Sequence, residues 1–283
     1  MAKMKYAKDD GVKEVFPLSR EMSSNNDVSS EDTPANGGLR SVADDYKKKD
    51  GILNQFLFVV VSGGTERERC FFQELDEKES FRSLKVVFLS SERNAGGLTP
   101  KMMQRKWLDC IQNGFVERNG RQFKIESIDR VYMVTDVDHY EEELRDILKT
   151  RKDKEPQWII SNPDIEIWIY YCFRNTPRED LQLVIDAPQN KRSSLMKTIN
   201  GTFNNGGGLD PRKAFAAITT GIKNASYFYQ EDSLHFPDLL STQMWFLAKD
   251  IYGVLGQEFI NWNDERIRRI NELISNLKES RNR

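Results

Sequence analysis

The sequence predicts an α/β protein with a mainly parallel β-sheet flanked by helices. Two observations carry this prediction: runs of β-branched and aromatic residues recur along residues 52–175, and stretches of helical apolar spacing separate them. Strands that alternate with helices of about 10 to 15 residues are typical of βαβ units, in which neighbouring strands run parallel. We also expect a mostly helical C-terminal part and a polar N-terminal arm.

Residues 1–51 form the predicted arm. Residues 22–40 are rich in Ser, Asn, Asp and Gly and contain almost no apolar side chain. Such a segment gains too little from burial to offset the entropy that it would lose on ordering. We therefore expect a flexible arm, followed by an α/β core at residues 52–178 and a helical region at residues 179–283.

The first two strands lie at residues 56–61 (FLFVVV) and 84–89 (LKVVFL). Continuous apolar runs of this kind are typical of strands that are buried on both faces of a sheet. The first strand ends at Ser62-Gly63-Gly64, which is a turn signal, and the pattern becomes helical from Thr65.

The same alternation continues through the rest of the core. A helix is predicted from Thr99-Pro100, with Pro at its first position, and a third strand at residues 130–135 (RVYMVT). A charged helix at 140–149 and a fourth strand at 158–160 follow, and Pro163 is expected to open an apolar helix.

Strand signals fade after Thr176. Residues 200–208 (NGTFNNGGG) are predicted to form a flexible loop, while residues 215–225, 239–255 and 267–277 have helical apolar spacing. We expect these helices to pack on one side of the sheet.

The composition limits the class of protein. There are 42 Lys and Arg against 44 Asp and Glu, a formal net charge of −2, so any nucleic-acid surface must be local. No stretch approaches the roughly 18 apolar residues that a membrane span needs, and no apolar signal core follows the N-terminus. The three cysteines form no C-x-x-C pair, and two histidines exclude a multi-His metal centre. These features favour a reduced, cytoplasmic protein without membrane association.

Carboxylates follow three of the predicted strands, namely Glu66, Glu68, Asp136, Asp138, Asp164 and Glu166. Because the carboxyl ends of parallel strands meet at one edge of a sheet, these side chains are expected to converge there. Hard oxygen ligands without a Cys or multi-His set favour Mg²⁺ or Mn²⁺. Such a cation polarises a phosphoryl oxygen or activates a water, which indicates phosphoryl transfer, including phosphodiester hydrolysis.

Each signal also has a purely structural interpretation. The alternating charges at residues 66–69 are compatible with a solvated first helical turn, where acidic residues are favoured. Ser161-Asn162-Pro163 is also a common way to start a helix. Gly63-Gly64 is not followed by Lys-Ser/Thr, which argues against a P-loop. The functional interpretation is favoured because the signals fall at three successive strand ends.

Three motifs resemble the RloB-like family, also called AbiLii-like. Residues 63–72 (GGTERERCFF) resemble its G-x-x-T-E-x-x-Y-F opening, and residues 135–138 (TDVD) resemble its D-x-D. Residues 161–168 (SNPDIEIW) resemble its S-N-P-x-F-E-x-W signature, the most specific of the three. Residues 222–225 and 241–243 look like later helical landmarks of the family.

The resemblance covers roughly residues 55–255 and implies a Toprim-like fold with a nuclease site. It implies catalytic roles for Glu68, Asp136, Asp138 and Glu166, with the first three also binding Mg²⁺ or Mn²⁺.

Arg67 stands where the family has Thr. This departure opens a second register, in which Glu66 is the catalytic carboxylate. We prefer Glu68, because its spacing to Gly63-Gly64 and to Phe71-Phe72 needs no gap.

Family members are encoded in phage-defence loci, usually beside an ABC/AAA-type ATPase. The resemblance thus implies a nuclease effector of a restriction or abortive-infection system that acts on tRNA, other RNA or DNA, with that ATPase as partner. Candidate substrate contacts, each of which also fits a solvated helix face, are Lys101, Arg105, Lys106, Arg212, Lys213 and Lys223. The alternative function is a non-catalytic Toprim-like interaction module that the ATPase regulates.

Overall fold

The computed structural model describes residues 55–91, 96–152 and 155–281. The predicted arm at residues 1–51 lies outside the described residues.

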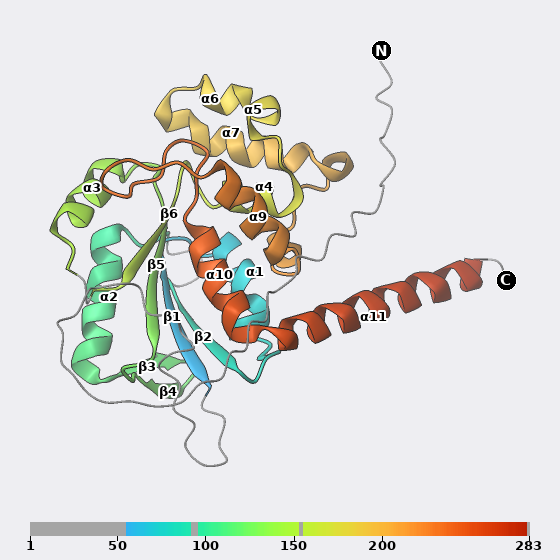
Figure 1. Cartoon of the computed structure of the whole chain (residues 1–283), viewed down its shortest axis with the longest axis horizontal. Coiled ribbons are helices and arrows are strands. Elements are labelled where there is room, and N and C mark those ends of the chain that lie inside the picture. Colours follow the sequence, from blue (N-terminus) through green and yellow to red (C-terminus); the bar gives the residue numbers. More distant parts are fainter. Residues whose placement is uncertain (1–54, 92–95, 153–154, 282–283) are drawn as a thin grey trace, which may run out of the picture. The chain divides into compact units, whose positions relative to one another are not determined.

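Four parallel strands form the sheet, which confirms the predicted fold class. They are β1 (Phe56–Ser62), β2 (Leu84–Leu89), β5 (Arg130–Asp136) and β6 (Gln157–Ser161), in the order β2-β1-β5-β6. Ser62 of β1 lies opposite Val134 of β5, and Asp136 of β5 lies opposite Ser161 of β6. The carboxyl ends of β1, β5 and β6 therefore meet at one edge of the sheet (Figure 1).

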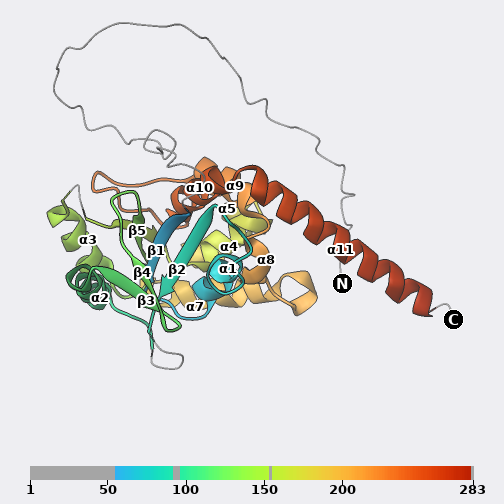
Figure 2. The same ribbon diagram turned by 90° about the horizontal axis from the view of Figure 1, so that it is seen from below.

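Two apolar clusters cover the two faces of the sheet. Leu57, Val59 and Val61 of β1 pack with α2 (Pro100–Asn113) and α3 (Glu141–Thr150). The intervening Phe58 and Val60 face the second cluster, which is formed with α1 (Arg67–Asp76), α4 (Glu166–Phe173) and α10 (Met244–Leu255). Figures 1 and 2 show the two sets of helices on opposite sides of the sheet. This double burial explains why β1 is continuously apolar from Phe56 to Val61.

The C-terminal part is mostly helical, as predicted. Its other elements are α5 (Pro177–Asp180), α6 (Gln182–Ile185), α7 (Gln189–Thr202), the 3₁₀ turn η1 (Asn204–Gly206), α8 (Pro211–Ala214), α9 (Ile218–Phe228) and α11 (Gln257–Arg281). Met196, Ala214 and Ile218 belong to the same apolar cluster as α1 and α4. The strands and the C-terminal helices thus share one core. No helix in the described part of the chain combines the length and apolarity that a membrane span requires.

The prediction of a loop at residues 200–208 is wrong for residues 200–202 and 204–206, which are helical. Helix α7 continues to Thr202, and η1 forms one further turn. Asn200 is 1% exposed, and its side chain donates hydrogen bonds to Glu166. Tertiary contacts therefore outweigh the weak helix propensity of Asn and Gly.

The predicted start of α4 at Pro163 is also wrong, because the helix begins at Glu166. Asp164 precedes it, and its Oδ1 accepts a hydrogen bond from the amide of Glu166 (3.1 Å), which satisfies one free donor of the first turn. The landmark at residues 241–243 is not helical, since Thr242 forms an antiparallel bridge with Ser161 at the end of β6.

The hairpin formed by β3 (Phe115–Arg118) and β4 (Arg121–Lys124) is an element that the sequence analysis missed. Asn119 and Gly120 connect the strands with φ of 52° and 72°. Two successive positive φ values are typical of a tight hairpin turn, for which Asn-Gly is the strongest sequence signal.

Candidate functional site

Glu68 lies in the first turn of α1, and its side chain turns back over the loop that follows β1. It is 3% exposed, and a Cβ atom added to Gly64 would lie 2.0 Å from Glu68 Oε1. Burial and the nearby charge of Glu166 raise the pKa of Glu68. Glu66, in contrast, is exposed and makes no side-chain cap to α1. The structure therefore places Glu68, and not Glu66, among the carboxylates of the sheet edge.

Asp136 is the last residue of β5, between β1 and β6. Burial raises the pKa of Asp136 well above its ordinary value, and the carboxylates of Glu68 and Asp164 raise it further. Such repulsion acts only between groups that lie close together. Residues from three different strand ends thus meet at this edge, as the sequence predicted.

Asp164 is fully buried beside them. Its Oδ2 accepts a hydrogen bond from Ser193 Oγ (2.6 Å), and Lys197 Nζ lies 3.8 Å from the same oxygen. Burial and the charge of Glu166 raise the pKa of Asp164 to about 7, although the bond from Ser193 opposes the shift.

Glu166 is held by two other side chains. Arg67 donates to both carboxylate oxygens through Nε and Nη2, the latter at 2.6 Å. Asn200 Nδ2 donates to Oε2 and to the backbone oxygen of Glu166, each at 2.9 Å. Because Glu166 is 1% exposed, these donors supply the partners that a buried charge needs. The Arg67 that departs from the family motif is thus the counter-ion of Glu166.

Helix α7 supplies polar side chains that the sequence analysis missed. Ser193, Lys197 and Asn200 are four and three residues apart, so they lie on one face of the helix. Lys197 is 58% exposed and lowers the pKa values of Glu68, Asp136 and Asp164, although burial and carboxylate repulsion outweigh it. In the sequence, the only sign of these three residues is the helical spacing of polar side chains, which any solvent-exposed helix face also has.

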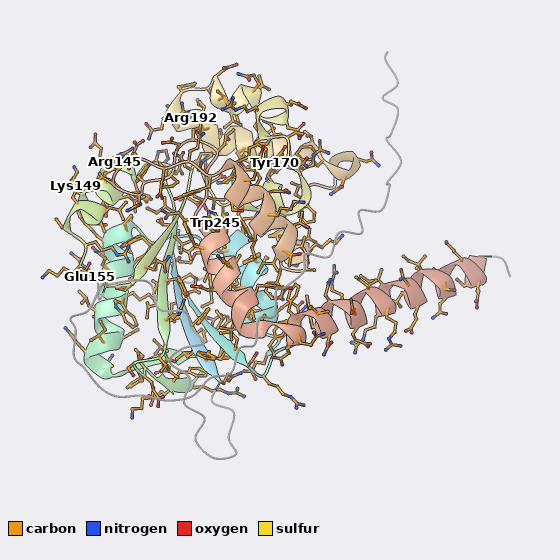
Figure 3. The ribbon with its side chains drawn as sticks, in the orientation of Figure 1. Arg145, Lys149, Glu155, Tyr170, Arg192 and Trp245 are labelled. Carbon is orange, nitrogen blue, oxygen red and sulfur yellow. The ribbon has the colours of Figure 1, made fainter. Side chains whose placement is uncertain are left out.

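Asp138 takes a different direction from Asp136. Its φ is 26°, and its Oδ1 lies 3.6 Å from Nε2 of the exposed His139. With Arg145 and other residues it lines an open surface hollow of about 670 Å³; Arg145 is labelled on α3 in Figure 3. The chain turns after β5. The side chain of Val137 is buried there, and the amide of Asp138 donates a hydrogen bond to the backbone oxygen of Pro163 (3.2 Å). The predicted metal-binding role of Asp138 stays a prediction.

The six basic residues predicted to contact substrate fall into two groups. Those on α2 are Lys101, Arg105 and Lys106, and those on α8 and α9 are Arg212, Lys213 and Lys223. The two groups belong to helices on opposite faces of the sheet. Five are exposed and Lys106 is partly so, while Arg212 pairs with Asp210 (3.0 Å). Their contact with substrate remains a prediction.

The carboxylates at the sheet edge are of the ligand type that a hard divalent cation prefers. Glu68 and Asp136 offer carboxylate oxygens whose mutual repulsion a cation would relieve. Among the described residues, no three His, Cys, Asp or Glu side chains are arranged so that they could hold a metal ion. Two carboxylates nevertheless suit Mg²⁺, which commonly keeps several waters and completes its shell with substrate phosphates.

Fold and site together define an α/β protein with a buried acidic cluster at the carboxyl edge of a parallel sheet. The chain belongs to the RloB-like family, because the model of that family, described as RloB-like protein, matches residues 58–251. The match confirms the family that the motifs indicated. No curated protein and no solved structure matches the chain.

Proposed function

We propose that the protein is a divalent-metal-dependent nuclease effector of a cytoplasmic antiviral defence system. The observation that carries the proposal is the convergence of Glu68 and Asp136 at the carboxyl ends of the neighbouring strands β1 and β5, where the charge of Glu68 raises the pKa of Asp136. Family membership supports the defence context, with an ATPase encoded nearby as partner and tRNA, other RNA or DNA as substrate. The Toprim-like character of the fold is part of this proposal.

Each residue has a separate task in the proposed reaction. Glu68 and Asp136 would hold Mg²⁺ or Mn²⁺, which supplies Lewis-acid polarisation of a phosphoryl oxygen and activation of water. Burial raises the pKa of Glu68, which favours a second role for this carboxylate as a proton acceptor. Lys197, exposed beside the cluster, would attract a phosphate.

Arg67, Glu166 and Asn200 would position the cluster and take no part in the chemistry itself. Their hydrogen bonds join the first turns of α1 and α4 to α7. Because Glu68 follows Arg67 directly, this network fixes the helical turn from which the Glu68 side chain extends.

The nuclease proposal is tested with matched carboxamide variants of neighbouring residues. Purified protein is incubated with tRNA, single-stranded DNA and duplex plasmid in Mn²⁺, Mg²⁺ or EDTA, with and without the ATPase. We expect metal-dependent cleavage that Glu68→Gln and Asp136→Asn each reduce by about 100-fold or more, since each removes a charged ligand or proton acceptor.

Glu66→Gln serves as the control, because Glu66 is two residues from Glu68 and is exposed. It should leave the cleavage rate within about twofold of wild type, as expected for an exposed site. Full activity of Glu68→Gln combined with loss of activity in Glu66→Gln would contradict the assignment. Cleavage that persists in EDTA would contradict the metal dependence.

A non-catalytic interaction module is the second candidate function. The observation that favours it is that, in the part of the chain that the structure describes, no three His, Cys, Asp or Glu side chains are arranged to hold a metal ion. A module of this kind has no need of a metal, so it predicts no uptake of Mg²⁺ or Mn²⁺ by the full chain.

A further inference from the structure

Helix α11 carries an apolar stripe that the rest of the described chain leaves exposed. From residue 267 to residue 280 every side chain is exposed. Among them and just before them are large apolar residues with 40–62% of their surface exposed: Ile260, Ile267, Ile270, Leu273, Ile274 and Leu277. A contiguous apolar surface of this kind marks an interaction site in a soluble protein.

The spacing of the stripe is that of a coiled coil. Ile267, Ile270, Ile274 and Leu277 occupy alternating a and d positions of a heptad, separated by three, four and three residues. On the opposite face, Glu265 pairs with Arg268 and Arg269 within the helix (2.8 and 2.7 Å). These charged side chains of the polar face therefore find partners within α11, whereas the apolar face needs a partner helix.

We propose that α11 pairs with α11 of a second copy of this chain in an antiparallel coiled coil. In the register that matches a to d positions, Ile267 lies opposite Leu277 of the second copy and Ile270 opposite Ile274. The twofold axis repeats each of these contacts, and Leu273 lies near the axis, close to Leu273 of the second copy. An interface of this kind is self-complementary and closes at two copies.

Charge complementarity selects this orientation. In the same register Asp264 faces Lys278 of the second copy, twice by symmetry, because both occupy e positions and e faces e in an antiparallel pair. Within the described residues, neither side chain makes an ion pair. A parallel pair would place Arg266 beside Asn271 and Leu273 beside Lys278, which brings no opposite charges together.

Sedimentation velocity of the full chain over a range of concentrations tests the association. Wild type should form a dimer, and Ile270→Asp/Ile274→Asp should remain monomeric, with Ser275→Asp on the far face of α11 as the matched control. Circular dichroism verifies that each variant is folded. Asp264→Lys or Lys278→Asp alone should weaken the dimer by about tenfold, and the double exchange should restore it.

Cysteine cross-linking distinguishes the two orientations. Leu273→Cys should form a disulfide-linked dimer under mild oxidation, whereas Ile267→Cys should do so only when it is mixed with Leu277→Cys; wild type reports the background from its native cysteines. A monomeric wild type, or a dimer that the paired Asp substitutions leave intact, would overturn the proposal. Efficient self-linking of Ile267→Cys would overturn the antiparallel arrangement.

Discussion

Gly64 and the Glu68 carboxylate share one small space behind the end of β1. A Cβ atom at residue 64 would lie 2.0–2.2 Å from the three carboxylate atoms. These atoms are the far end of a flexible side chain, so a methyl group at this position moves the carboxylate and leaves the backbone in place. Glycine at this position therefore makes room for the proposed metal ligand.

Gly64→Ala should thus reduce metal-dependent cleavage strongly without unfolding the protein. We expect a loss of about tenfold to 100-fold, because a displaced catalytic group forfeits much of its contribution, and a melting temperature close to wild type. Gly253→Ala is the matched control, since no atom lies within 4 Å of its added Cβ. An unchanged cleavage rate in Gly64→Ala would show that the position of Glu68 does not matter.

At the residue scale, strand-end carboxylates could be predicted from the sequence, but their partners could not. Glu68, Asp136 and Glu166 follow from the rule that parallel strands end at one edge. In the sequence, Arg67 belongs to a run of alternating charges that is compatible with a solvated helical turn. Its pairing with Glu166 could not be predicted from that run, because the two residues lie 99 positions apart. Lys197 and Asn200 reach the site only through the packing of α7, which no local pattern encodes.

At the scale of elements, apolar runs predicted the four long strands well because burial on both faces leaves little ambiguity. The boundaries failed where a side chain outside the pattern decided them, as Asp164 does at the start of α4 and Asn200 at the end of α7. The β3–β4 hairpin was missed although Asn119-Gly120 signals its turn. Its strands are short, with only Val116 fully buried, so their apolar pattern is weak.

Glu258 connects the start of α11 to the residues just before β2. Its carboxylate accepts hydrogen bonds from the amides of Arg82 and Ser83 (2.6 and 3.1 Å), just before β2 begins. Burial disfavours the charge, but these bonds and the Ser83 hydroxyl outweigh it and lower the pKa of Glu258 below its ordinary value of 4.5. The ionised form therefore stabilises the folded state.

Glu258→Gln should lower the free energy of unfolding at pH 7 by about 1 kcal/mol, because an amide replaces a charged acceptor. A carboxyl with a lowered folded pKa contributes its stability above pH 4.5 and loses it as the pH falls through the folded value. The difference from wild type should therefore shrink towards pH 3. Urea unfolding at both pH values measures it, with Glu279→Gln further along α11 as control. A difference that is constant with pH would contradict the proposed linkage.

At the scale of the whole molecule, the charge balance and the site have to be considered together. A net charge of −2 gives little general attraction to nucleic acid. The acidic cluster would itself repel phosphate, with Arg67 and Lys197 as its nearby cations. Under the proposed function, a bound divalent cation would reverse the local sign of the charge at the cluster, so affinity for nucleic acid should depend on metal more than on the protein surface.

Metal binding should therefore stabilise the full chain, and the variants separate the roles of the two Asp residues after β5. At about 100 times its dissociation constant a ligand adds about 2.7 kcal/mol, or several degrees in melting temperature. We expect this shift with Mg²⁺ or Mn²⁺ in wild type and its absence in Asp136→Asn. Asp138→Asn should retain most of it, since that side chain faces His139 in the structure.

The pH dependence of this stabilisation is the sharper test. Burial and the charges of neighbouring carboxylates raise the pKa values of Glu68 and Asp136, so protons compete with the cation at acidic pH. The metal-induced shift in melting temperature should consequently grow as the pH rises, and calorimetry should detect proton release on binding. If neither metal stabilises wild type at any pH and calorimetry shows no uptake, the interaction-module function is favoured over the nuclease. Loss of the shift in Asp138→Asn would instead show that Asp138 turns towards Asp136 when the metal binds.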